Sequence, residues 1–125
     1  MKRKLLSLLV MVATAHVSAQ VTDSMIAKDA TDTDSVLSWG MGTQGQRFST
    51  LTTINTKNVS KLAPVWSMSF GGEKQRGQES QPLVYKGKMF VTASYSRIFA
   101  IDVKTGEKVW KYEHRLPEGI MPCCD

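Results

Sequence analysis

Four short runs of apolar residues, separated by turn residues, constrain this chain more than any other feature of its sequence. The runs are short enough to be strands and contain many β-branched and aromatic residues. They cover residues 82–85, 88–93, 97–103 and 108–112. The segments between them hold the Gly, Ser, Thr and Lys residues of tight turns, at 86–87, 94–96 and 104–107. The pattern predicts an antiparallel meander, which is one blade of a β-propeller, although part of a β-sandwich gives similar strands.

The residues before the meander predict less regular structure. A short helix is expected over Ser24–Ala30, capped by Thr22 or Ser24. A single helical turn is expected over Asn58–Leu62. The loosely alternating segment Ala63–Phe70 predicts a further strand, and the polar, glycine-rich segment Gly71–Ser80 predicts a loop.

The segment Ala100–Trp110 has the spacing of a unit that stacks on copies of itself. Asp102 and Thr105 are placed to bond the backbone of a turn, and Gly106 is placed to take its left-handed position. Trp110 then offers a large apolar area for packing between adjacent blades. Trp39 and Trp66 are interpreted in the same way, as packing residues between blades.

Cys123 and Cys124 are the only cysteines, and they are adjacent. A disulfide usually joins Cα atoms about 4.4–6.8 Å apart, whereas neighbours across a trans peptide lie about 3.8 Å apart. A bond between these two sulfur atoms would close a small, strained ring, and such strain is found mainly where it serves a site. Two free, buried thiols are the simpler alternative, and the spacing alone leaves both open.

Residues 1–19 have the composition of a cleaved export signal. Basic residues at 2–4 precede an apolar run at 5–15, and small residues at 17–19 suit a signal peptidase. An uncleaved membrane anchor is the alternative. This leader holds three basic residues and no acidic one, so its removal lowers the formal net charge from +5 to +2. The charge therefore gives no reason to expect nucleic-acid binding. Export to the periplasm also favours oxidation of cysteines.

The chain resembles the pyrroloquinoline quinone (PQQ)-dependent alcohol dehydrogenases, and most of all their soluble, ethanol-dehydrogenase type. The resemblance covers nearly all of the chain after the leader. The most specific motifs are Gln78-Glu79 and Pro122-Cys123-Cys124-Asp125, while the Ala100–Trp110 repeat is shared with other propellers of this kind. Further matching motifs are Gln46-Arg47-Phe48-Ser49, Leu62-Ala63-Pro64-Val65-Trp66, Arg76–Leu83, Tyr95–Asp102 and Pro117–Ile120.

The resemblance implies a fold and a cofactor site. The fold is all-β, and residues 20–125 are expected to form the N-terminal part, about one to two blades, of an eight-bladed β-propeller. The resemblance implies a disulfide between Cys123 and Cys124 that packs against PQQ, and Glu79 as a hydrogen-bonding partner of PQQ. Without the resemblance, Glu79 is interpreted as a solvated loop carboxylate. Arg76 is a steering or surface charge, Arg97 a strand-exposed or inter-blade residue, and His114 a structural one.

The implied function is oxidation of primary alcohols to aldehydes in the periplasm, with PQQ and a calcium or lanthanide ion and with cytochrome c as electron acceptor. The catalytic base and the metal ligands are expected beyond Asp125, so these 125 residues are interpreted as an N-terminal fragment that is inactive alone. The oligomeric state stays open, a homodimer of the full-length protein included. The main alternative is a non-enzymatic propeller scaffold of the outer-membrane assembly type, and a binding module with a chance blade is a third interpretation.

Overall fold

A computed structural model describes residues 20–71, 79–115 and 117–120 of the chain. Its regular elements are a short helix α1 (Asp23–Lys28), two 3-10 turns η1 (Asp29–Thr31) and η2 (Val59–Lys61), and strands β1 (Leu83–Tyr85), β2 (Lys88–Ala93), β3 (Arg97–Asp102) and β4 (Lys108–Glu113). In this part of the chain no helix has the length and apolar character that crossing a membrane requires. The predicted leader, residues 1–19, lies outside the described residues.

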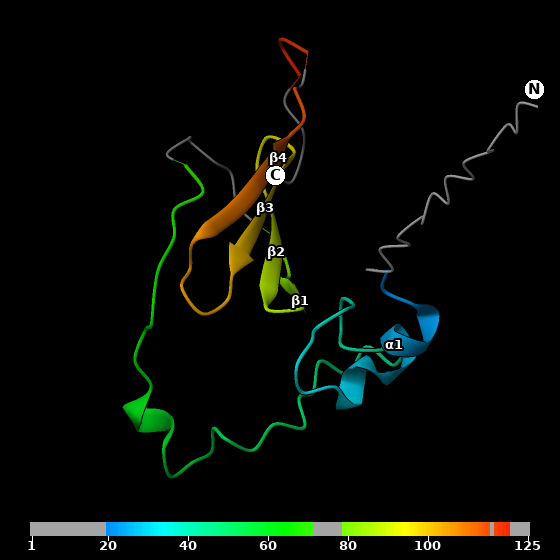
Figure 1. Cartoon of the computed structure of the whole chain (residues 1–125), viewed down its shortest axis with the longest axis vertical. Helices are drawn as coiled ribbons and strands as arrows, with labels where there is room; N and C mark the ends of the chain where they lie inside the picture. Colours follow the sequence, from blue (N-terminus) through cyan, green and yellow to red (C-terminus); the bar gives the residue numbers. More distant parts are fainter. Residues whose placement is uncertain (1–19, 72–78, 116, 121–125) are drawn as a thin grey trace, which may run out of the picture.

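The strands form one antiparallel sheet in the order β1-β2-β3-β4, as the meander predicted (Figure 1). Leu83 pairs with Phe90, Phe90 with Ala100, and Ala100 with Trp110, so one row of residues crosses the whole sheet. Two of the three hairpin turns, at Lys86-Gly87 and Tyr95-Ser96, have positive φ at both of these residues. This left-handed geometry matches the twist of the strands that it joins. The expected strands agree with the observed ones to within one residue at each end.

The core lies on one face of the central strands. Val91, Ala93, Phe99 and Ile101 are buried there, and they alternate along β2 and β3 because successive side chains of a strand point to opposite faces. Trp66, Met68, Phe70 and Met89 pack against this cluster. Burial of one large apolar side chain contributes about 1.5–3 kcal/mol to folding, so a core of this size holds the hairpins together but is small.

The segment Ala63–Phe70, predicted as a strand, is not one in the described structure. Its alternation is real, because Trp66, Met68 and Phe70 pack on the core whereas Val65 is 86% exposed. No ladder of backbone hydrogen bonds joins it to β1–β4. The prediction was wrong because alternation records which side chains are buried, and a strand also requires a pairing partner.

The residues around α1 form a small unit tied to the edge of the sheet. Thr22 caps α1 by accepting a hydrogen bond from Met25 N, as expected. Asp29 follows α1 and is fully buried. Its two carboxylate oxygens accept hydrogen bonds from the backbone N–H groups of Leu37 and Ser38, at 2.8 and 2.9 Å, and from the Ser38 hydroxyl at 2.6 Å. These bonds shape the segment that pairs with β1 through the bridge between Val36 and Val84.

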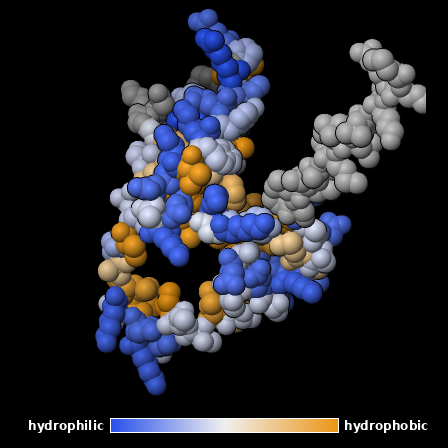
Figure 2. All heavy atoms as spheres, viewed as in Figure 1, coloured by the Kyte–Doolittle hydropathy of each residue, from blue (hydrophilic) through white to orange (hydrophobic). Residues whose placement is uncertain are grey.

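Several large apolar side chains lie on the surface of the described structure. Between α1 and the sheet the chain runs away from the strands before it returns to them (Figure 1). Apolar patches interrupt the polar surface in this view (Figure 2). The exposed residues of this connecting segment include Phe48, Leu51, Ile54, Val59, Leu62 and Val65. Apolar surface of this extent generally marks a place that another surface covers.

Candidate functional site

Sheet topology gathers the predicted site segments at one end of the blade. Because the strands are antiparallel, the start of β1, the turn between β2 and β3, and the last residue of β4 all lie at the same end. Glu79 comes four residues before β1, and the chain leaves β4 at Glu113 toward the cysteine pair. We call this end of the sheet, with the turn 94–96 and the segments next to it, the loop end.

Glu79 lies at the loop end as an exposed residue. The residues that follow it are anchored to the rest of the molecule. The hydroxyl oxygen of Ser80 accepts a hydrogen bond from Thr92 N at 3.2 Å, and Gln81 Nε2 donates to Ser38 O at 3.4 Å. The carboxylate of Glu79 is therefore open to a ligand, next to backbone that is fixed to β2.

The other predicted cofactor residues fall outside the described part of the chain. Cys123 and Cys124, with the disulfide expected between them, lie outside the described residues, and so does Arg76. Within residues 20–71, 79–115 and 117–120, no group of three His, Cys, Asp or Glu side chains is arranged to hold a metal ion.

Of the two roles expected for Arg97, a strand-exposed position is wrong, because the residue is buried. It is only 8% exposed. Its Nε donates to Ser94 O at 2.7 Å and its Nη1 donates to Phe70 O at 2.8 Å. One side chain thus joins the turn between β2 and β3 to the segment that leads into the loop before Glu79. One signal in the sequence could have indicated this, because an arginine begins an otherwise apolar strand. The carbonyl groups that it contacts could not be predicted.

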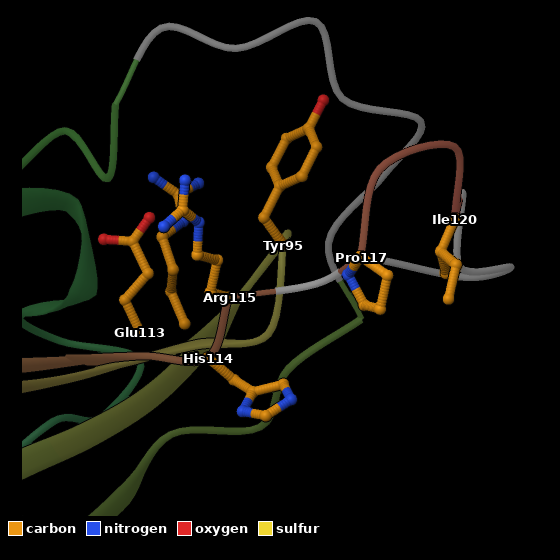
Figure 3. Close-up of a pocket in the computed structure, with 7 residues that line it drawn as sticks. Tyr95, Glu113, His114, Arg115, Pro117 and Ile120 are labelled. Atoms are coloured by element: carbon orange, nitrogen blue, oxygen red, sulfur yellow. The ribbon is translucent and has the colours of Figure 1, made fainter.

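A pocket of about 410 Å³ opens at the loop end. In Figure 3 it is framed by Tyr95 from the turn, by Glu113 at the end of β4, and by residues that follow this strand. Its lining residues are Tyr95, Arg97, Glu113, His114, Arg115, Pro117 and Ile120. The lining brings two arginines and a histidine to the end of the sheet at which β4 ends.

Two of the residues that line the pocket are held by contacts along the strand edge. A hydrogen bond from Lys111 Nζ to the carboxylate of Glu113, with the attraction between their charges, lowers the pKa of Glu113. Glu113 therefore stays ionised at neutral pH and offsets part of the positive charge at this end. The backbone N–H of His114 donates to Ser96 O at 3.3 Å, and the residue is exposed.

The opposite end of β3 and β4 holds the turn that begins at Asp102. The Asp102 carboxylate accepts hydrogen bonds from the backbone N–H groups of Thr105 and Lys104, at 3.0 and 2.9 Å, which lower its pKa. Gly106 has a φ of +73°, as expected for its place in the turn. The indole of Trp66 lies against Gly106 and donates from Nε1 to Val103 O at 3.0 Å. Trp66 is thus the tryptophan that packs on this turn. Trp110 packs against Phe90 instead and is 43% exposed.

Comparison with known proteins gives a family model and several relatives. Residues 37–122 match the model described as "PQQ: Glucose/ethanol/alcohol dehydrogenase, beta-propeller domain". A quinoprotein ethanol dehydrogenase of Pseudomonas aeruginosa is 57% identical over 113 residues, which are 90% of this chain and 18% of that protein. A 1-butanol dehydrogenase (cytochrome c) of Thauera butanivorans is 39% identical over 88 residues, which are 69% of this chain and 12% of that protein.

The solved structures include a similar fold. The quinohemoprotein alcohol dehydrogenase from Comamonas testosteroni matches with a TM-score of 0.68 and 36% identity, over 75% of this chain and 14% of that one. The chain therefore spans less than a fifth of the length of these relatives.

Proposed function

Because this chain belongs to the β-propeller family of the PQQ-dependent glucose, ethanol and alcohol dehydrogenases, we propose that it is the N-terminal part of an enzyme that oxidises primary alcohols to aldehydes with PQQ. The 57% identity to an ethanol dehydrogenase over 90% of the chain carries this proposal. The shared end of the sheet, from which both the Glu79 loop and the segment toward Cys123 and Cys124 depart, supports it.

The exposed basic side chains at the loop end suit an anionic cofactor. Glu79 is exposed there, and Arg115 and His114 bring exposed basic groups to the same end. In the proposed site, Glu79 accepts a hydrogen bond from the cofactor, and the side chains of Cys123 and Cys124, joined by a disulfide, form a flat support for its ring. PQQ supplies an acceptor for the two electrons that leave the alcohol. This chain's own residues then bind and orient the cofactor.

The remaining features of the proposed enzyme come from residues outside the described part or from the family. We propose that residues 1–19 are a cleaved signal, that the protein acts in the periplasm, and that residues 20–125 belong to a propeller of eight blades. A calcium or lanthanide ion, held by ligands beyond Asp125, would act as a Lewis acid on the alcohol. Cytochrome c is the proposed electron acceptor, and the name of the Thauera butanivorans relative supports it.

The test uses the full-length protein, by which we mean the product of the reading frame that contains this chain. It is produced in the periplasm, loaded with PQQ and either calcium or a lanthanide, and assayed for reduction of a dye and of cytochrome c with ethanol and 1-butanol. Alcohol-dependent reduction is expected. A well-folded full-length protein that retains no PQQ and oxidises no alcohol would contradict the proposal and favour the scaffold alternative.

A further inference from the structure

Glu79 is exposed, so the position of its carboxylate depends on the backbone that carries it. A glutamate side chain rotates about several bonds, and ordering it and its backbone when a ligand binds costs conformational entropy. That cost falls if the neighbouring backbone is already fixed before the ligand arrives. The two residues that follow Glu79 both supply such anchors through their side chains.

The backbone ladder of β1 stops before it reaches Glu79. Its last pair with β2 is Leu83 with Phe90, although β2 continues to Ala93. Pro82 precedes β1, and a proline has no N–H group to donate to a neighbouring strand. Regular strand pairing therefore does not extend to the backbone beside Glu79.

The Ser80 hydroxyl holds this backbone on the side of β2. It accepts a hydrogen bond of 3.2 Å from Thr92 N, which belongs to the part of β2 beyond the β1 ladder. A side-chain oxygen thus serves as the acceptor that a strand carbonyl would otherwise provide. Because Ser80 is joined to Glu79 by a peptide bond, the contact restrains the backbone that carries the carboxylate.

Gln81 acts on the opposite side of β1. Val36 and Val84 pair there through backbone hydrogen bonds of 2.9 and 2.8 Å, and Gln81 Nε2 donates to Ser38 O at 3.4 Å. Ser38 is itself fixed, because its backbone N–H and its hydroxyl both donate to the buried carboxylate of Asp29. The contact of Gln81 therefore leads to the small unit around α1.

We propose that Ser80 and Gln81 are positioning residues, which tie the backbone beside Glu79 to β2 and to the unit around α1 and so set where its carboxylate meets the cofactor. This inference rests on the proposed function. Neither residue touches substrate or cofactor in this role. Their contacts lead to different parts of the molecule, so together they restrain the direction of the chain as well as its position.

The test uses Ser80→Ala and Gln81→Met in the full-length protein, each alone and combined with Glu79→Gln. PQQ affinity is measured by quenching of tryptophan fluorescence. Each single substitution should weaken PQQ binding about two- to tenfold, the range for loss of one neutral hydrogen bond. Combined with Glu79→Gln, the same substitutions should weaken binding by less than about twofold, because residues that act through one another have non-additive effects.

Hydrogen exchange without cofactor reports the Ser80 anchor independently of PQQ. Ser80→Ala should speed exchange of the Thr92 amide, which loses this hydrogen bond. Ser80→Thr keeps the hydroxyl, so it should restore both slow exchange and PQQ affinity. Ser49→Ala is the matched control, because it removes a hydroxyl that accepts a backbone hydrogen bond of the same length, 3.2 Å, from Leu51 N in the connecting segment. It should change neither quantity.

Equal losses of PQQ affinity with and without the Glu79 carboxylate would overturn the proposal, since the two residues would then act on the site by another route. Unchanged PQQ affinity in folded Ser80→Ala and Gln81→Met proteins would overturn it as well. A wild-type full-length protein that binds no PQQ would refute the proposed function and this inference with it. Wild-type binding with additive losses refutes the inference alone, so the two failures are distinguishable.

Discussion

Trp66 Nε1 donates a hydrogen bond of 3.0 Å to the carbonyl oxygen of Val103, and its indole ring covers Gly106 in the same turn. Trp66 and Val103 are 37 positions apart in the sequence, so this hydrogen bond fixes the segment around Trp66 against the turn between β3 and β4. It also explains why the turn requires glycine. A Cβ atom on Gly106 would lie 2.5 Å from the indole.

Gly106→Ala is expected to destabilise the full-length protein by about 2–4 kcal/mol, since it adds a steric clash to the strain of a positive φ. Gly87→Ala is the matched control. Gly87 has a similar φ of +71°, but a Cβ atom there meets nothing within 4 Å. It should cost only about 1 kcal/mol. Urea unfolding measures both variants, and equal losses would show that the indole does not restrict position 106.

Asp29→Ala is expected to cost about 1–3 kcal/mol, because it leaves part-buried hydrogen-bond donors without an acceptor. The N–H groups of Leu37 and Ser38 would lose their acceptor. Asp34→Ala, at an exposed position of the same region, should change the unfolding free energy by less than about 0.5 kcal/mol. Thermal unfolding compares the two, and a small effect of Asp29→Ala would contradict the structural role of this carboxylate.

Asp102 should titrate below the ordinary value of 3.8, because backbone hydrogen bonds from Thr105 and Lys104 favour its ionised form. The folded pKa is then below the unfolded one. The stabilisation by Asp102 is therefore complete above about pH 4, and it is lost as the pH falls through the lowered folded value. NMR titration of the Asp102 carboxyl carbon measures the midpoint. A midpoint at or above 3.8 would show that the turn does not favour the carboxylate.

Glu79→Gln is expected to weaken PQQ binding by about tenfold or more, if the carboxylate accepts a charge-assisted hydrogen bond from the cofactor. Because Glu79 is exposed, the thermal stability of the protein without cofactor should stay unchanged. Glu107→Gln, another exposed carboxylate at the opposite end of the sheet, is the control and should leave PQQ affinity unaltered. The proposed contact is wrong if the two variants bind PQQ equally well.

The cysteine pair should be oxidised in the full-length protein isolated from the periplasm. Mass spectrometry before and after reduction is expected to show a gain of two hydrogen atoms in the peptide that holds Cys123 and Cys124. The double substitution of both by Ser should then lower PQQ affinity. Detection of both thiols in free form in the active enzyme would remove the disulfide from the proposed site.

The blade was predictable because its strands and turns are determined locally. The Lys86-Gly87 turn, the alternation in β2 and the Asp102–Gly106 turn each have a signal within a few residues. The site was harder to predict from the sequence. Glu79 and the cysteine pair came from the resemblance, whereas Arg97 was expected to be strand-exposed or inter-blade and proved to be buried within this blade. Its partners, Ser94 and Phe70, are backbone carbonyl groups, and these carry no residue-specific signal.

The four strands, the turns between them and the family follow from the sequence, because each depends on short-range patterns or on matched motifs. Three contacts emerge only in the folded chain: Trp66 rather than Trp110 packs on the Gly106 turn, Ala63–Phe70 packs without pairing, and Arg97 joins two distant segments. Those outcomes depend on which surfaces meet when the chain closes on itself. Residues far apart along the chain share no local pattern from which such contacts follow.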